Sequence, residues 1–346
     1  MDPFELLQRL SEAPGASGDE GAVRAILKEA VQEHADEIRV DALGNLIVHQ
    51  RGTREGAPRV MVEAHMDEVG LMITRIESDG TLRFRAVGGI DPRILPAKVV
   101  RIGKDRIPGV IGMKPAHLLT DREERQVLEI KDLRIDIGAS SREDAEKVVR
   151  LGDRAVFDTA YEDLGPRVKG KAFDDRAGCT VLATILAHGP YPIDLYAVFA
   201  VQEEIGLRGA RVAAYQVAPD MAFALEGTIA DDLPKEKDES PTTELGKGPA
   251  LTVMDRSVIV DPRLLRFLIQ VAEREGIPYQ FKQPGIGGTD AGRIHLAREG
   301  VPSAVVAVPC RYIHGPTSLL DKRDLERTIQ LMEAALRTIP ADLLAR

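Results

Sequence analysis

The sequence predicts an α/β fold, in which a mostly parallel central sheet is flanked by helices and interrupted by an inserted β-barrel-like domain. Two patterns predict it. Apolar strands alternate with amphipathic helices towards both ends of the chain, whereas the middle consists of short strands between turn signals. The 346 residues also exceed the roughly 100 to 200 of a single domain. We expect a main domain of residues 1–69 and 167–346 and a β-rich insert of residues 70–166.

The first third of the chain alternates helix and strand. A Ser-Gly-Asp-Glu cap at residues 17–20 precedes a helix whose apolar residues recur at the helical period over residues 23–31. A Gly-Asn turn and the apolar run 46–49 follow. Residues 59–64 (RVMVEA) then predict a short buried strand that ends at His65.

A change of pattern marks the insert. Between Gly70 and about Pro166, short alternating strands are separated by turn signals such as SDG at residues 78–80, GG at 88–89 and GKD at 103–105. The pattern indicates a β-rich unit inserted into the α/β domain.

Helix and strand alternate again after Arg167. An Asp-Pro pair at residues 261–262 has the form of a helix N-cap followed by proline at the first helical position, and Asp321 is expected to cap the C-terminal helix. The polar residues 231–249 predict a functional loop or an assembly contact, because ordinary connections are shorter. The other expected elements are a helix over residues 177–186 and strands over 194–201, 221–225 and 303–308, the last of these being the final strand.

Composition narrows the possible functions. The contents of 44% hydrophobic and 29% charged residues are typical of a globular protein, and the net charge of -9 without a basic run argues against nucleic-acid binding. No apolar stretch approaches the roughly 18 residues of a membrane helix, and the N-terminus lacks the features of a signal peptide, so we expect a cytoplasmic protein without a membrane partner. Cys179 and Cys310 are too few for a disulfide framework and are expected to pack as small apolar side chains.

Acidic and imidazole side chains recur after predicted strands and at helix starts. A lone histidine in such a place is more often structural, and paired carboxylates are usually solvated. Repetition favours a shared site, because burying several carboxylates without a cation is costly. Histidine and carboxylate ligands suit zinc, cobalt or manganese. The clusters are His65 with Asp67, Asp174 with Asp175, Glu203 with Glu204, Glu226, and His314.

These residues lie in six motifs through which the sequence resembles the tetrahedral, or TET, aminopeptidases, which include glutamyl and deblocking aminopeptidases. The resemblance covers essentially the whole chain, and the motifs occur in the family's order. They are AHMDEVG (64–70), AFDDRAG (172–178), VQEEIGLRGA (201–210), ALEGTIADD (224–232), GGTDAG (287–292) and YIHGPTS (312–318).

The resemblance implies a role for each motif residue. Asp174 would bridge two metal ions and be joined to Asp175 by a cis peptide. His65 and Glu226 would complete one metal site, and Glu204 and His314 the other. Some relatives have Asp in place of Glu226.

The catalytic assignments follow from the same resemblance. Glu203 would be the general base, and Asp67 would orient His65. The protein would then be a two-metal aminopeptidase that hydrolyses the N-terminal peptide bond of short peptides through a water held between the metals. The insert would drive dimerisation, and dimers would build a hollow dodecameric tetrahedron.

Several alternatives stay open. Thr289 and Asp290 either cap a helix or form a wall of the substrate site. A deacylase or carboxypeptidase would use the same metal cluster, whereas a glycosidase is disfavoured by the absence of Trp and an aromatic content of 4%. The preferred N-terminal residue is also open, and Arg256, Lys235 or Lys237 would favour acidic substrates if they faced the site.

Overall fold

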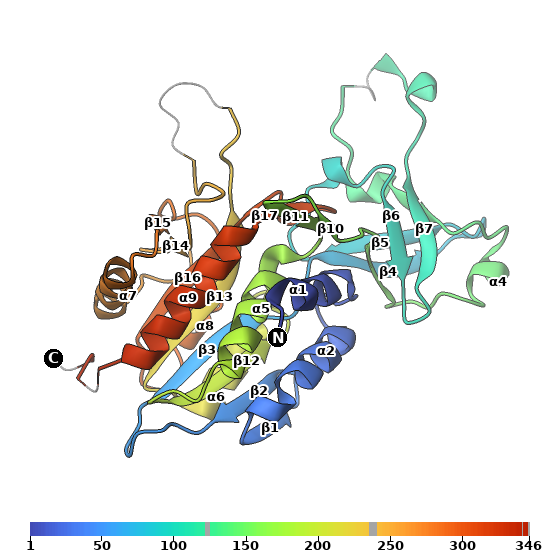
Figure 1. The fold of residues 1–346 in the computed structure, drawn as a ribbon. Helices are drawn as coiled ribbons and strands as arrows, with labels where there is room; N and C mark the ends of the chain where they lie inside the picture. Colours follow the sequence, from blue (N-terminus) through green and yellow to red (C-terminus); the bar gives the residue numbers. More distant parts are fainter. Residues whose placement is uncertain (122–124, 235–240, 341, 345–346) are drawn as a thin grey trace.

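The computed structural model describes residues 1–346 except 122–124, 235–240, 341 and 345–346. In the described residues, an eleven-stranded sheet forms the main body and a closed barrel projects from it (Figure 1). Along its main path, the sheet has the order β1 (Glu37–Val40), β2 (Leu46–Gln50), β12 (Asp194–Ala200), β3 (Arg59–His65), β13 (Met221–Ile229), β16 (Ser303–Arg311), β17 (Ser318–Asp321), β11 (Arg167–Gly170) and β10 (Glu162–Asp163). The short strand β14 (Ala250–Leu251) pairs with β16 and with β15 (Gln280–Phe281).

The centre of the sheet is parallel. Strands β12, β3, β13 and β16 are parallel neighbours, whereas β2 and β17 join them in antiparallel pairs. The predicted α/β class is confirmed, with parallel pairing between strands confined to these four and to β14 with β15 among the described residues. Because parallel strands end at the same edge, the segments that follow β3, β12 and β16 meet there.

Helices cover both faces of the sheet. Strand β3 shows why: Val60 and Val62 face one apolar core, while Met61 between them faces the other. The helices on the first face are α1 (Pro3–Glu12), α2 (Gly21–Val31), α5 (Phe173–Ala187), α7 (Pro262–Glu275) and α9 (Lys322–Thr338). The helices on the second face are α6 (Arg208–Val217) and α8 (Ala291–Ile294).

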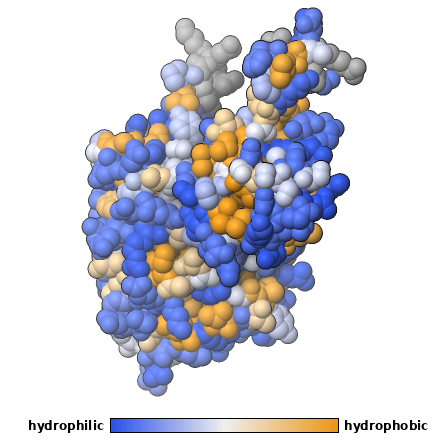
Figure 2. Space-filling model, turned by 90° about the vertical axis from the view of Figure 1, so that its right-hand side faces the viewer, coloured by the Kyte–Doolittle hydropathy of each residue, from blue (hydrophilic) through white to orange (hydrophobic). Residues whose placement is uncertain are grey.

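The barrel has its own apolar core, built from residues such as Leu71, Phe84 and Ile135. Its strands, in closed order, are β4 (Gly70–Ile76), β5 (Leu82–Val87), β8 (Arg134–Asp136), β7 (Ile107–Gly112), β6 (Val99–Ile102) and β9 (Arg154–Phe157). Besides α8, the shorter helices in the described residues are α4 (Arg142–Ala145), η1 (Gln32–His34), η2 (Pro92–Ile94), η3 (Ala116–Leu118) and η4 (Ile130–Asp132). Figure 2, which looks onto the barrel end of the molecule, shows apolar side chains gathered among polar ones.

Most predicted elements are present, with two corrections. The Asp261 and Asp321 caps are confirmed, because each carboxylate accepts a hydrogen bond from the backbone NH two residues later. Ser17 is not the cap of α2: its hydroxyl donates instead to the carboxylate of Asp67. The strand at 303–308 is not the last, because β17 follows it after a turn.

The predicted domain boundaries stay a prediction. Strand β4 begins the barrel at Gly70, and β11 continues the main sheet from Arg167. The short strand β10, inside the predicted insert, pairs with the main sheet. None of the helices in the described ranges is both long and apolar enough to span a membrane.

Candidate active site

Six residues singled out in the sequence meet at the carboxyl edge of the parallel strands. They line one cavity of about 640 Å³. They are His65 at the end of β3, Asp174 at the start of α5, Glu203 and Glu204 after β12, Glu226 in β13, and His314 after β16.

Five of these side chains form two groups that share Asp174. His65, Asp174 and Glu226 form the first group, and Asp174, Glu204 and His314 form the second. Within each group, the potential ligand atoms lie within 4.8 Å of one another. The peptide between Asp174 and Asp175 is cis, as the resemblance implies.

The spacing of these atoms fits a divalent cation in each group. The Nε2 atoms of His65 and His314 lie 3.4 Å from Oδ1 and Oδ2 of Asp174, respectively, so each oxygen faces a different group. Ligand atoms around a tetrahedral zinc ion are separated by about 3.3 to 3.5 Å, because each bond is about 2.1 Å long. Among the described atoms, Asp174 Oδ1 is buried and has no hydrogen-bond partner, which a cation would supply.

Backbone carbonyls hold both imidazoles. His65 Nδ1 lies 3.0 Å from the carbonyl oxygen of Asp67, and His314 Nδ1 lies 2.9 Å from that of Gly89. With a proton on Nδ1, each ring donates to its carbonyl, and Nε2, which faces the carboxylates, is the nitrogen at which a cation would replace a proton. The Asp67 carboxylate, expected to orient His65, lies farther away, at 3.5 Å from Nδ1.

The Asp67 carboxylate instead contacts the loop that carries the two glutamates. It is fully buried and accepts hydrogen bonds from the backbone NH groups of Glu203 (2.9 Å) and Glu204 (3.2 Å) and from the Ser17 hydroxyl (2.6 Å). Burial favours its neutral form, but interactions with His65 and Ser17 outweigh burial and lower its pKa. Asp67 is therefore an anion that positions the loop bearing Glu203 and Glu204.

Glu203 lines the cavity but belongs to neither group of ligand atoms. Its Oε2 lies 3.9 Å from His65 Nε2. Burial raises the pKa of Glu203 well above its usual value; the charge of His65 opposes this effect and the neighbouring carboxylates add to it. Its carboxyl group therefore lies beside the two groups of potential ligands.

Raised pKa values at Glu204 and His314 show how the ionisable groups of the site affect one another. Burial raises the pKa of Glu204 to about 8, although His314 opposes it. Burial disfavours the charge on His314, but Asp174 and Glu204 outweigh that effect and raise its pKa to about 9. At neutral pH the metal-free cluster therefore holds protons that a cation would displace.

A buried ion cluster lies behind the site. Lys171 Nζ contacts both oxygens of Glu68, at 2.6 and 2.8 Å, and Arg176 lies 3.3 Å from the same carboxylate. Burial lowers the pKa of Lys171 to about 8, although Glu68 opposes this. Sequence reasoning missed this cluster, although Glu68 and Arg176 stand inside the AHMDEVG and AFDDRAG motifs.

Thr289 and Asp290 have different positions. Thr289 lines the cavity, and its hydroxyl donates to Asp255 Oδ2 at 2.9 Å. Asp290 stands at the N-cap position of α8, but its side chain makes no capping hydrogen bond within the described chain. Its backbone NH donates to Glu226 Oε1, and its buried carboxyl faces that of Glu63. Burial raises the pKa of both carboxyl groups.

Arg256, one of the cationic residues considered for substrate preference, does not line the cavity. Arg256 is exposed, and its backbone NH donates to the carbonyl of Gly287. Lys235 and Lys237 lie outside the described residues. Lys282, which sequence reasoning missed, lines the cavity and is buried. Its only signal in the sequence is its place shortly before the GGTDAG motif.

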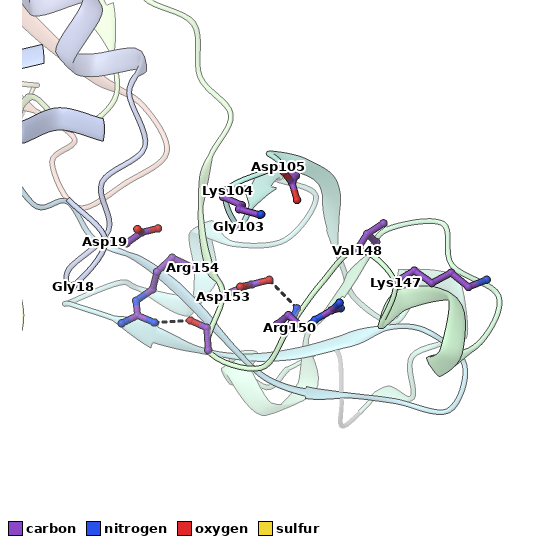
Figure 3. Close-up of a pocket in the computed structure, with 11 residues that line it drawn as sticks. Gly18, Asp19, Gly103, Lys104, Asp105, Lys147, Val148, Arg150, Asp153 and Arg154 are labelled. Atoms are coloured by element: carbon purple, nitrogen blue, oxygen red, sulfur yellow. Dashed lines mark hydrogen bonds between the residues drawn. The ribbon is translucent and has the colours of Figure 1, made fainter. Parts of the chain in front are cut away.

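A second cavity, of about 570 Å³, lies between the barrel and the loop before α2 (Figure 3). Its lining carries basic and acidic side chains in similar number, from turns of the barrel and from Asp19. Of these, Arg154 donates to the carbonyls of Ser17 and Gly152, and Lys147 pairs with Asp144. Neither group of potential metal ligands includes a residue of this cavity.

Comparison with known proteins agrees with the geometry of the first cavity. Residues 44–331 match the family model described as M42 glutamyl aminopeptidase. The chain belongs to the M42 peptidase family. As a member it is a metallo-aminopeptidase, a hydrolase that acts on peptide bonds. The predicted family and enzyme class are confirmed.

Relatives of this M42 peptidase resemble it over nearly their whole length. A lysyl aminopeptidase of Pyrococcus furiosus is 38% identical, and the match covers 98% of each chain. The crystal structure of a TET aminopeptidase from Thaumarchaeota archaeon SCGC AB-539-E09 has a TM-score of 0.94 at 38% identity and 99% coverage of both chains. TET1 of Pyrococcus horikoshii, which assembles into a tetrahedron or a large octahedral shell, has a TM-score of 0.86 at 35% identity, with 98% of this chain and 100% of that chain covered.

Proposed function

We propose that this M42 peptidase uses two divalent cations per subunit and Glu203 as general base to remove the N-terminal residue of short peptides. One observation carries the proposal: two groups of ligand atoms share Asp174, and Glu203 lines the same cavity but belongs to neither. Zinc or cobalt suits the histidine and carboxylate donors, and manganese is compatible with them.

The first metal site would consist of His65, Asp174 and Glu226, and the second of Asp174, Glu204 and His314. Bound cations would polarise the scissile carbonyl and increase the acidity of the attacking water. Holding the water and the substrate carbonyl in one cavity would also align the water oxygen with the carbonyl carbon.

The chain's own residues would then move the proton. The Glu203 carboxylate takes a proton from the attacking water, whose oxygen forms a bond to the carbonyl carbon. The same carboxyl group returns the proton to the nitrogen of the breaking peptide bond, and an amino acid and a shortened peptide leave. Asp67 keeps Glu203 in place, because its carboxylate accepts a hydrogen bond of 2.9 Å from the backbone NH of Glu203.

Metal removal and readdition test this function. The protein would be treated with a chelator, dialysed, and assayed with leucine p-nitroanilide before and after addition of zinc, cobalt or manganese. We expect activity to disappear and return with two metal ions per chain, and N-acetylated leucine p-nitroanilide to be a poor substrate because it lacks a free amine. Full activity with less than one metal ion per chain would overturn the proposal, and preference for the acetylated substrate would indicate a deacylase.

We also propose that the insert of residues 70–166 forms a dimer interface and that dimers assemble into a dodecamer in the cytoplasm. The barrel exposes apolar side chains on paired strands, with Val99 of β6 and Val110 of β7 directly opposite each other and 44% and 47% exposed. Light scattering should give the mass of twelve chains, and Val110→Glu should reduce it. A monomer at working concentration would contradict the assembly.

A further inference from the structure

We propose that Lys282 makes the enzyme select substrates with an acidic N-terminal residue. The proposal deepens the proposed function, on which it rests. Lys282 follows the short strand β15, and its backbone NH donates to the carbonyl of Leu251 in β14 at 3.0 Å. This pairing fixes the start of its side chain at the wall of the cavity that holds the two groups of metal ligands.

The Lys282 residue is largely buried, and no described residue supplies a counter-ion for its ammonium. Only 6% of the residue is exposed. Across the described part of the chain, its Nζ takes part in no hydrogen bond or ion pair, unlike the buried Lys171, which contacts Glu68 at 2.6 Å. Gly287 lies beside the ammonium, because a Cβ added at this glycine would be 3.6 Å from Nζ. Because a buried charge without a partner is unfavourable, a carboxylate that entered the cavity would gain an interaction that an apolar group could not make.

The position of the cation matches the first residue of the substrate. The carbonyl of that residue must lie beside the metal ligands, so its side chain enters the remainder of the same cavity. Part of that remainder is apolar, with Leu207, Ile229 and Ile313 in its lining. Among the described lining residues, Lys282 is the one Lys or Arg.

The carboxylates of the site do not satisfy this charge. None of Asp174, Glu203, Glu204 and Glu226 forms an ion pair with Lys282 in the described coordinates, which places their oxygens more than 4.0 Å from its Nζ. Bound divalent cations would neutralise the three of these groups that are potential ligands, Asp174, Glu204 and Glu226. The side-chain carboxylate of an N-terminal Glu or Asp would then be the counter-ion of Lys282, and a Lys or Arg side chain would be repelled.

The test compares p-nitroanilides of Glu, Gln, Leu and Lys on the metal-loaded enzyme. These substrates have no C-terminal carboxylate. A preference for Glu among them therefore cannot come from Lys282 binding the C-terminus of a peptide. Glu and Gln differ by the charge and are nearly equal in size. We expect kcat/KM for Glu to exceed that for Gln by about 10- to 100-fold, the range of a hydrogen bond to a charged group.

Two substitutions and a matched control assign the preference to one residue. Lys282→Met removes the charge and keeps the length of the chain, so the Glu/Gln ratio should fall towards 1; Lys282→Glu should make Lys the better substrate. Arg256→Met removes an exposed cation from the segment that contacts Gly287 and should leave the ratio unchanged.

Three results would overturn the proposal. The first is a Glu/Gln ratio near 1 in the unsubstituted enzyme, which requires no variant to fold. The second is a ratio that survives in Lys282→Met, and the third is a ratio that depends on Arg256. Metal-dependent hydrolysis of leucine p-nitroanilide without a Glu preference would reject the role of Lys282 alone, whereas no metal-dependent cleavage of any substrate would reject the proposed function with it.

Discussion

Two cavities of similar volume differ in the chemistry of their walls. The first, of about 640 Å³, lies at the carboxyl edge of the parallel strands, and the second, of about 570 Å³, lies between the barrel and the loop before α2. In the first, the side chains of Asp174, Glu203, Glu204 and Glu226 gather with no more than 11% of any of them exposed. In the second, charged side chains are satisfied locally, as when Arg154 donates to two backbone carbonyls. Unsatisfied buried charge therefore distinguishes a catalytic cavity better than volume does.

The largest expected difference concerns Asp174, which belongs to both ligand groups. We expect Asp174→Asn to weaken binding of both metal ions and to reduce kcat/KM by more than about 100-fold, beyond the usual effect of losing a residue that only supports a ligand. Metal analysis after dialysis and leucine p-nitroanilide hydrolysis measure this. The control is Asp153→Asn in the second cavity, which should keep both metals; full activity in Asp174→Asn would refute the shared ligand.

A smaller effect is expected at Asp67, which touches the loop of Glu203 and Glu204. Asp67→Asn keeps the size of the side chain but places an NH2 group where backbone NH groups now donate. We expect kcat to fall by about 10- to 100-fold, the range for residues that orient metal ligands. Ser17→Ala, which removes one of the three hydrogen bonds to Asp67, should have less effect. An equal loss of kcat in Asp67→Asn and Ser17→Ala would mean that Asp67 acts through its hydrogen bond with Ser17 and not through the loop of Glu203 and Glu204.

Metal binding should depend on pH. In the metal-free protein the pKa values are raised to about 8 for Glu204 and about 9 for His314, so both groups are mostly protonated at pH 7. A cation binds their deprotonated forms, so binding releases protons and affinity should increase as pH rises from 7 to 9. Calorimetric titration of metal in buffers of different ionisation enthalpy measures the protons released. A value of zero at pH 7 would show that the cluster is already deprotonated.

The smallest effect is expected in the second cavity. Lys104 is exposed, and Lys104→Ala should leave kcat/KM unchanged and alter the free energy of unfolding by less than about 0.5 kcal/mol. Enzyme assays and denaturant unfolding check both values. If Lys104→Ala lost activity while its oligomeric mass stayed the same, the second cavity would take part in catalysis, and the distinction between the two cavities would be wrong.

The candidate site could be predicted largely because parallel strands bring their ends to one edge. That rule explains why residues as distant in sequence as His65, Glu226 and His314 meet. It could not place contacts made by irregular backbone. The carbonyl of Gly89, in the predicted insert, holds His314 across 225 residues of sequence.

Local patterns also failed where tertiary contacts compete with them. Ser17 looks like a helix cap, but the buried Asp67 carboxylate takes its hydroxyl hydrogen bond. Strand β17 is only four residues long and has no clear alternation, so the sequence does not predict it. Lys282 lies in no motif, and only its burial in the wall of the cavity beside the potential metal ligands draws attention to it.

The central claim is that adjacent glutamates have different tasks, with Glu204 as a metal ligand and Glu203 as the base. Metal content and turnover of Glu203→Gln and Glu204→Gln, both under saturating metal, test it most directly. We predict that Glu203→Gln keeps two metal ions and loses activity by roughly 10² to 10⁴-fold, whereas Glu204→Gln loses or weakens one metal ion along with activity. A Glu203→Gln protein that loses a metal, beside a Glu204→Gln protein that keeps both and is only slower, would contradict the account.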